Sequence, residues 1–248
     1  IESSRKKLFE KRKERIHPLK DDKILTDWNG LMIASLAQGG MVLNNKQYIK
    51  KAINAADFIH KHLQRNDGRL VKRYRKGHSG LDPHINDYSF MIWGLINLYE
   101  ATFKTIYLLR ALKLAEVMVE DFYDENGGFF IGSKSAEKLI IRAKDYYDGA
   151  IPSGNSAAIY SLFKLGKITG NIDWINMAHQ TLKAFSYQVK RNPSSFTYLL
   201  TGLLFDMKDC KELIIVIDKS KHDLKNILIR IKKEYYPNFI IIVKDIND

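Results

Sequence analysis

The stretch WNGLMIASLAQGGMVL, from Trp28 to Leu43, contains no charged residue, and YSFMIWGLINLY, from Tyr88 to Tyr99, has the same character. A helix that is apolar on every face has to be buried on every face. Between these two stretches, KQYIKKAINAADFIHKHL (46–63) places its apolar residues along one helical stripe and its charged residues opposite, as an amphipathic helix does. The alternation predicts an inner layer of buried helices surrounded by an outer layer of amphipathic ones.

The outer-type helix is repeated along the chain. The pattern Tyr48-Ile49-x-x-Ala52 recurs 59 residues later from Tyr107 and again 67 residues after that from Trp174, and the turn Asp67-Gly68 is echoed 59 residues on by Asn126-Gly127. A period of this size, with two helices in each unit, is typical of stacked helical hairpins. The fold class is therefore mostly α, and periodicity alone leaves open whether the hairpins close into an α/α toroid or form an open solenoid.

The residue pattern of the chain changes from Glu212 onward. The β-branched runs LIIVI (213–217) and FIIIV (239–243) flank a segment with one apolar helical face, DLKNILIRIKKEYY (223–236). This order predicts a small C-terminal β-α-β element with a right-handed crossover. It carries no glycine-rich phosphate loop, so we interpret it as structural. We expect two parts, a helical part over 1–210 and the β-α-β element over 211–248.

Composition narrows the function classes. The formal net charge is +12, yet the lysines are scattered and no RNA-recognition signature or zinc finger accompanies them, which favours a basic solvated surface over nucleic-acid binding. The single Cys210 excludes a disulfide framework and a cysteine-rich zinc site. Apolar runs stay shorter than the roughly 20 residues of a membrane span, and the charged first twenty residues do not resemble a secretory leader. We expect a soluble, cytoplasmic protein. Because its first residue is Ile, we also expect it to be processed or part of a longer chain.

Polar residues gather where the inner helices are predicted to start. Successive inner helices of a two-layer ring run parallel, so we expect their N-termini to share one mouth. Residues of this kind are also ordinary helix caps, each worth about 1 kcal/mol, and any one cluster by itself is better explained as a cap. The clusters are Thr26, Asp27, Trp28 and Asn29; Asn86, Asp87 and Tyr88; and Asp148, Ser153 and Asn155.

Such a mouth suits carbohydrate chemistry. Asp27, Asp87 and Asp148 are the candidate catalytic carboxylates, because glycosidic cleavage needs one acid of raised pKa and one ionised carboxylate. Trp28 and Tyr88 are candidate sugar platforms. Asn29, Ser153 and Asn155 are candidates for binding hydroxyl groups. Neither His78 nor His84 has metal-ligand spacing to another ligand, and we expect neither metal nor cofactor.

Several long segments together resemble a known family. KLFEKRKERIHPLKDDKILTDWNGLMIASLA (7–37) is similar to a segment of the YyaL-type, or spermatogenesis-associated thioredoxin-like, protein family. The stretches NDYSFMIWGLINLYEATF, RAKDYYDGAIPSGNSAA, KELIIVID and YYPNFIIIV follow in that family's order and spacing, so the resemblance covers essentially the whole chain.

The resemblance implies a six-hairpin glycosidase-like (α/α)6 toroid. It implies that a thioredoxin-like domain and the earlier hairpins lie outside this chain, which would make the rest of the parent chain its partner. It adds Arg142, Lys144 and Asp145 to the candidate substrate-binding residues, since they match the family pattern. The sequence departs from that pattern at Asn86, where the family has an acid, and at Ser89, where it often has Ala.

Two functions follow as hypotheses. One is a carbohydrate-binding or carbohydrate-active portion, glycosidase-like or epimerase-like. The other is a non-catalytic scaffold whose mouth holds the thioredoxin-like domain or a client protein. The resemblance assigns no reaction, so whether the chain is an enzyme is left open.

Overall fold

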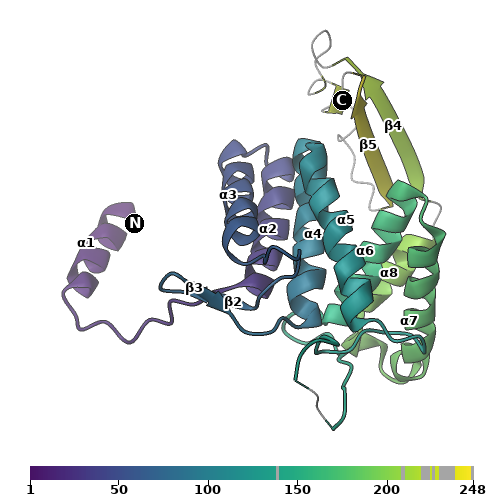
Figure 1. Cartoon of the computed structure of the whole chain (residues 1–248). Helices are drawn as coiled ribbons and strands as arrows, with labels where there is room; N and C mark the ends of the chain where they lie inside the picture. The colour runs from purple at the N-terminus through teal and green to yellow at the C-terminus, as the bar shows by residue number, and fades with distance from the viewer. Residues whose placement is uncertain (138–139, 208–209, 219–223, 225–226, 229–237, 247–248) are drawn as a thin grey trace.

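The computed structural model describes residues 1–137, 140–207, 210–218, 224, 227–228 and 238–246. Its body consists of helices that alternate between an inner and an outer position (Figure 1). Inner helices lie next to one another, α2 beside α4, α4 beside α6 and α6 beside α8, and each outer helix packs on the inner helix before it. The inner helices are α2 (Thr26–Val42), α4 (Ile85–Thr102), α6 (Gly154–Thr169) and α8 (Thr197–Met207). The outer helices are α3 (Lys46–His62), α5 (Thr105–Phe122) and α7 (Ile172–Arg191). The two-layer prediction is confirmed.

Backbone contact between inner helices explains their glycines. An added Cβ on Gly30 of α2 would lie 2.5 Å from the Phe90 carbonyl carbon of α4, and one on Gly94 would lie 2.7 Å from the Gly30 oxygen. Both distances are too short for any side chain, so the two helices meet where neither has one. The close approach buries α4 almost completely from Asp87 to Tyr99.

The 59-residue repeat is visible in the loops that follow α3 and α5. Gly68 donates its N–H to the Arg65 carbonyl at 3.0 Å, and Gly127 donates to the Asp124 carbonyl at 2.8 Å. Both glycines have positive φ, 86° and 91°, which suits a residue without Cβ. Antiparallel bridges close both loops, Gln64 with Leu70 and Tyr123 with Phe129. The repeat is thus a structural unit of helix, helix and closed loop.

The N-terminal segment lies apart from this body. Helix α1 (Glu2–Lys13) has no buried residue, and residues 14–23 after it are exposed (Figure 1). The chain joins the body at β1 (Ile24–Leu25), which pairs with β2 (Arg73–Arg75), and β2 pairs with β3 (His78–Gly80), all antiparallel. This small sheet leads directly into α2.

The C-terminal strands β4 (Lys211–Ile217) and β5 (Phe239–Asp245) pair in parallel, as predicted, with Lys211 opposite Phe239. The predicted helix between them falls largely outside the described residues. Strand β5 packs on the helical body, where the Val243 N–H donates to the Tyr99 hydroxyl at 3.3 Å. A short 3-10 turn, η1 (Pro193–Ser195), precedes α8. Within the described ranges, we find no helix with the length and apolar character that crossing a bilayer requires.

Candidate functional site

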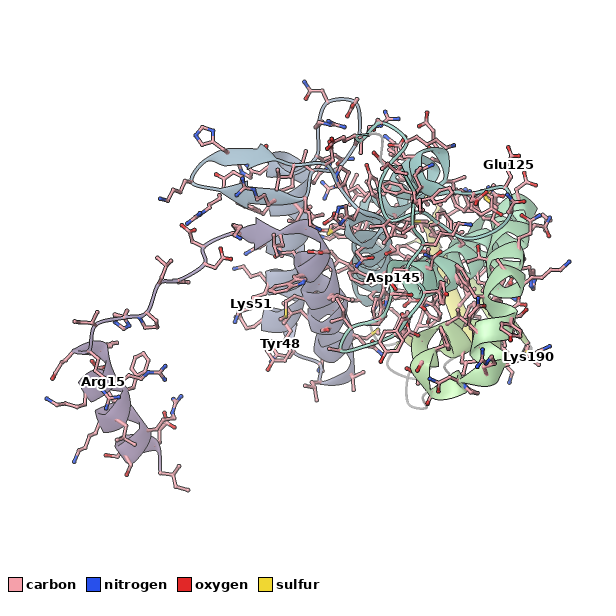
Figure 2. All side chains as sticks on the ribbon, turned by 90° about the horizontal axis from the view of Figure 1, so that it is seen from below. Arg15, Tyr48, Lys51, Glu125, Asp145 and Lys190 are labelled. Atoms are coloured by element: carbon pink, nitrogen blue, oxygen red, sulfur yellow. The ribbon has the colours of Figure 1, made fainter. Side chains whose placement is uncertain are left out.

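The inner helices all begin at the same end of the body. The Asp27 N–H at the start of α2 donates to Asp87 Oδ1 at the start of α4, at 3.1 Å. A Cβ on Gly154, the first residue of α6, would lie 3.2 Å from the Asn86 nitrogen of α4. Asp148, just before α6, accepts from the Tyr198 N–H at the start of α8. The predicted convergence of helix N-termini is therefore confirmed. Figure 2 views the molecule from this end, with Asp145 near the middle of the face.

Two of the three predicted carboxylates meet at one lysine. Lys72 Nζ lies 3.4 Å from Asp27 Oδ2 and 3.5 Å from Asp87 Oδ2. Asp87 is fully buried, whereas Asp27 keeps 8% of its surface exposed. We call Asp27, Lys72 and Asp87 the carboxylate–lysine cluster. It lies where α2 begins, where α4 begins and where the chain enters β2.

Burial sets the electrostatics of this cluster. Loss of solvent raises the pKa of Asp87 to about 7, and the nearby Asp27 charge acts in the same direction. Lys72 opposes the rise, as do the hydrogen bonds that Asp87 accepts from the backbone N–H groups of His84, at 2.7 Å, and Asp27. Burial and Lys72 lower the pKa of His84. A carboxyl group with a pKa near 7 can exchange a proton at neutral pH, as a general acid or base must.

Asp148 does not belong to this cluster in the structure. Its carboxylate accepts three backbone N–H groups, from Ser153 at 2.9 Å, Tyr198 at 2.8 Å and Leu199 at 3.1 Å. It therefore joins the start of α6 to the first turn of α8. Ser153 is the N-cap of α6, and its hydroxyl accepts from the Ser156 N–H at 3.1 Å. The structure thus brings two of the three predicted carboxylates to one lysine and places Asp148 at the junction of α6 and α8, where it accepts backbone N–H groups as Asp87 also does. The catalytic role predicted for Asp148 stays a prediction.

Tyr88 and Asn155 hold the closed loops in place. The fully buried Tyr88 hydroxyl accepts from the Leu70 N–H at 2.9 Å. The fully buried Asn155 accepts from the Phe129 N–H at 2.7 Å and donates to the Phe129 carbonyl at 2.9 Å. Leu70 and Phe129 are 59 residues apart, and Tyr88 and Asn155 are 67 apart, so both pairs follow the repeat. In this placement Tyr88 offers no ring face to a ligand and Asn155 has no free amide.

Two exposed aromatic residues lie near this end, Trp28 with 63% of its surface accessible and Tyr147, in the loop before α6, with 59%. The backbone N–H of Trp28 donates to Asp27 Oδ1 at 2.8 Å, which holds the first turn of α2 against the cluster. Asn29 donates from Nδ2 to the Leu25 carbonyl at 2.7 Å and so fastens β1 to α2. Of Trp28 and Asn29, Trp28 is therefore the residue whose side chain is free to stack on a ligand.

The candidates taken from the family pattern lie on the loop before α6, where most of their polar groups are engaged. Arg142 donates to the Gly132 carbonyl at 2.9 Å and stacks its guanidinium on a phenylalanine ring. The Lys144 ammonium donates to the Gly127 carbonyl at 2.6 Å and to the Asp124 carboxylate at 2.7 Å. The hydrogen bond to Asp124 lowers the pKa of that carboxyl group. Asp145 is exposed, while its backbone carbonyl accepts from an asparagine amide. These contacts order the loop.

Sequence reasoning missed Lys72 and an aromatic patch on three inner helices. The rings of Trp93 on α4 and Tyr198 on α8 have centroids 4.6 Å apart, and Tyr160 on α6 lies 5.8 Å from Tyr198. Helix α6 stands between α4 and α8 and is covered on its outer side by α7. The rings must therefore meet on the opposite face of the inner layer. All three residues are half-buried. Lys72 lies 45 residues from Asp27, and no motif links them.

Comparison with known sequences finds relatives that match almost the whole of this chain. No family model matches the chain. The human protein named spermatogenesis-associated protein 20 is 33% identical over 99% of this chain, and an uncharacterised protein of Caenorhabditis elegans is 26% identical over 98%. The matches cover 33% and 34% of these relatives, so the chain spans about a third of their length.

Comparison with solved structures shows the (α/α)6 toroid fold. A GH76 α-mannanase from Bacteroides thetaiotaomicron has a TM-score of 0.61 and 20% identity, over 77% of this chain and 54% of that one. Cellobiose 2-epimerase from Bacillus thermoamylovorans has a TM-score of 0.55 and 14% identity, over 67% and 45%. A D-mannose isomerase has a TM-score of 0.52 and 16% identity, over 66% and 42%. The choice between toroid and solenoid is settled for the toroid, of which the chain corresponds to about half.

Proposed function

We propose that this homologue of spermatogenesis-associated protein 20 is the half-ring portion of a longer thioredoxin-domain-containing protein. We further propose that it binds a carbohydrate at the end where its inner helices begin. The fold supports the proposal, because the toroids that it resembles are named for three different reactions, all on sugars. Because one fold can carry many different reactions, the proposal depends on the residues at that end.

The observation that carries the proposal is the carboxylate–lysine cluster. Asp27 and Asp87 each have an oxygen within 3.5 Å of the same Lys72 nitrogen. Those oxygens can therefore be no more than about 7 Å apart, so the two carboxylates and the lysine form one cluster. Burying two carboxylates side by side is costly, and Lys72, whose side chain keeps 25% of its surface exposed, offsets only part of that cost. A purely structural cap would not need the second carboxylate or the lysine.

The two carboxylates differ in access, which suggests a division of roles. Asp27 keeps 8% of its surface accessible and Asp87 none, so we assign Asp27 as the group that contacts a sugar hydroxyl or a glycosidic oxygen. Asp87 is fully buried, and burial raises its pKa to about 7. We assign Asp87 as the positioning residue that fixes Asp27 and Lys72 and that takes up or releases a proton near neutral pH. This arrangement fits glycosidase-like or epimerase-like acid–base chemistry.

The stacking surface that sugars favour is supplied by residues other than Tyr88. Trp93, Tyr160 and Tyr198 form the half-buried patch on the inner layer. Tyr and Trp combine an apolar ring face with a polar edge, which suits a ligand that has both.

The test is binding of sugars to the purified chain. Thermal-shift and calorimetric titrations with mannose, mannobiose, cellobiose and glucose should give a saturable signal that Asp27→Asn abolishes. Asp57→Asn is the matched control, because Asp57 is an exposed aspartate whose partner is Arg110 on the neighbouring outer helix. Absence of saturable binding across the panel, in a chain that circular dichroism shows to be folded, would count decisively against a carbohydrate site.

A non-catalytic scaffold is the second candidate. It is favoured by the many predicted site residues whose polar groups the fold itself uses, among them Asp148, Tyr88 and Asn155. In that case Asp27→Asn and Asp57→Asn would behave alike with every sugar, and the exposed apolar surface of the half-ring would be its functional surface.

A further inference from the structure

One side of α2 is apolar and uncovered. Trp28, Met32 and Val42 keep 63%, 55% and 71% of their surfaces exposed. Ser35 is also exposed and Gly39 is half-exposed. We call these five residues the free α2 face. A large apolar surface of this kind on a folded protein marks an interaction site.

The spacing of the free α2 face is that of a helix–helix contact. Its residues follow at intervals of four, three, four and three, which is the repeat that keeps one seam of a helix against a partner helix. The face carries no charge. By contrast, the exposed positions of α3 next to it include Lys50, Lys51 and Asp57, as expected for a surface that meets water.

Helix α2 lies at the end of the series of inner helices, which explains why this face is free. Helix α4 has inner neighbours on both sides, α2 and α6, and α6 likewise lies between α4 and α8. Among the described elements α2 has an inner neighbour on one side only. At Gly39, an added Cβ would meet only Tyr48 Cδ2, at 3.9 Å, so the backbone there is open to close approach, as it is at Gly30 where α4 packs.

Helix α1 indicates which kind of helix belongs there. The chain alternates between inner, nearly uncharged helices and outer, charged ones, and α1 directly precedes the inner helix α2. Its sequence ESSRKKLFEKRK is strongly charged, as for an outer helix, and it buries no residue. By the same alternation we expect an inner, uncharged helix before α1 in longer proteins of this kind. Because α1 is so charged, it cannot itself cover the uncharged face of α2.

We propose that the free α2 face is the docking surface for an uncharged inner helix that comes directly before α1 in longer proteins of this kind, with α1 as its outer cover. The inference rests on the proposed function in one respect, that the chain is a portion of a longer protein. Two lengths support it. The chain spans about a third of its curated relatives, and it covers 54% of the mannanase toroid, so half a ring remains to be supplied.

The test uses the whole 248-residue chain and, as probe, the part of the human relative that lies outside the matched region. The two are co-expressed, co-purified and then titrated by biolayer interferometry. The variant is Met32→Lys with Val42→Lys, which places two cations on the seam. The matched control, Asn176→Lys with Tyr187→Lys, adds the same charges to exposed positions of α7, on the other side of the body (Figure 1).

Wild type and the α7 control should bind the probe, and the α2 variant should bind at least about tenfold more weakly, since central interface positions dominate affinity. Circular dichroism should show both variants folded, because all four positions are exposed. Equal binding by the two variants, or failure of wild type to bind, would overturn the proposal. So would a dimer in light scattering that only the α2 variant dissociates, which would identify a second copy as the occupant. No sugar is present, so this result is independent of the carbohydrate test.

Discussion

The raised pKa of Asp87 makes the stability of the protein depend on pH in a direction opposite to that of most carboxylates. The group is fully buried, and burial raises its pKa from 3.8 to about 7. Between these values the unfolded chain has released the proton while the folded chain still holds it. The free energy of unfolding therefore falls as pH rises from about 4 to 7, and it is level above 7.

The size of the effect follows from the shift. A difference of about three pH units, at about 1.4 kcal/mol each, amounts to about 4 kcal/mol across the window. Replacement by Asn removes the ionisation and keeps the shape. Part of this window lies below pH 4.5, so urea denaturation at pH 4.5, 6.0, 7.5 and 8.5 should show the wild type losing about 3 kcal/mol relative to Asp87→Asn between the first and third of these pH values.

A control of opposite sign exists in the same protein. The hydrogen bond from Lys144 lowers the pKa of Asp124, so the stability that this carboxylate contributes is present above pH 3.8 and is lost as pH falls further. Asp124→Asn should therefore remove a dependence at acidic pH and leave the window between 4.5 and 7.5 unchanged. Parallel pH curves for wild type and Asp87→Asn would refute the reasoning, and a wild type that gains stability across that window would reverse its sign.

Two further predictions concern packing and capping. Gly30→Ala should destabilise the protein by about 2 to 3 kcal/mol in urea denaturation, because the added Cβ would lie 2.5 Å from the α4 backbone. Gly39→Ala in the same helix should be neutral or stabilise the protein by up to about 1 kcal/mol. Similar losses of stability for both variants would contradict the close approach of α2 and α4. Asp148→Ala should lower the free energy of unfolding by about 2 to 4 kcal/mol, because it leaves three backbone N–H groups without their acceptor. Asp145→Ala, at an exposed side chain that accepts one backbone N–H, should lower it by less than about 1 kcal/mol. Equal losses of stability would show that the cap at α8 is dispensable.

The layers of this fold could be predicted from sequence because each layer follows from one physical rule. The uncharged stretches around Trp28–Leu43 and Tyr88–Tyr99 had to be buried, and the charged stripe of 46–63 had to face water. The repeat also predicted the common end of the inner helices, since equivalent helices run parallel. The two C-terminal strands followed from their β-branched runs.

The individual roles at that common end could not be predicted in the same way. Asp, Asn and Ser at a helix start look alike in sequence whether they bind a ligand or the backbone. Tyr88 and Asn155 bind loop N–H groups that lie 18 and 26 residues earlier, and Asp148 binds N–H groups about 50 residues later. Lys72 was missed because its partnership with Asp27 and Asp87 depends on how the chain enters β2.

Asp87 and Asp148 do the same structural work, and comparing them locates the chemistry. Each accepts backbone N–H groups from the start of a neighbouring inner helix, Asp87 from α2 and Asp148 from α8. A capping role and a functional role are therefore not alternatives at these positions. Asp87 differs from Asp148 in its charged neighbours. Lys72 and Asp27 lie against Asp87, whereas the described hydrogen bonds of the Asp148 carboxylate all come from backbone N–H groups. Since a cap needs neither a lysine nor a second carboxylate, the junction of α2 and α4 is where function should be sought.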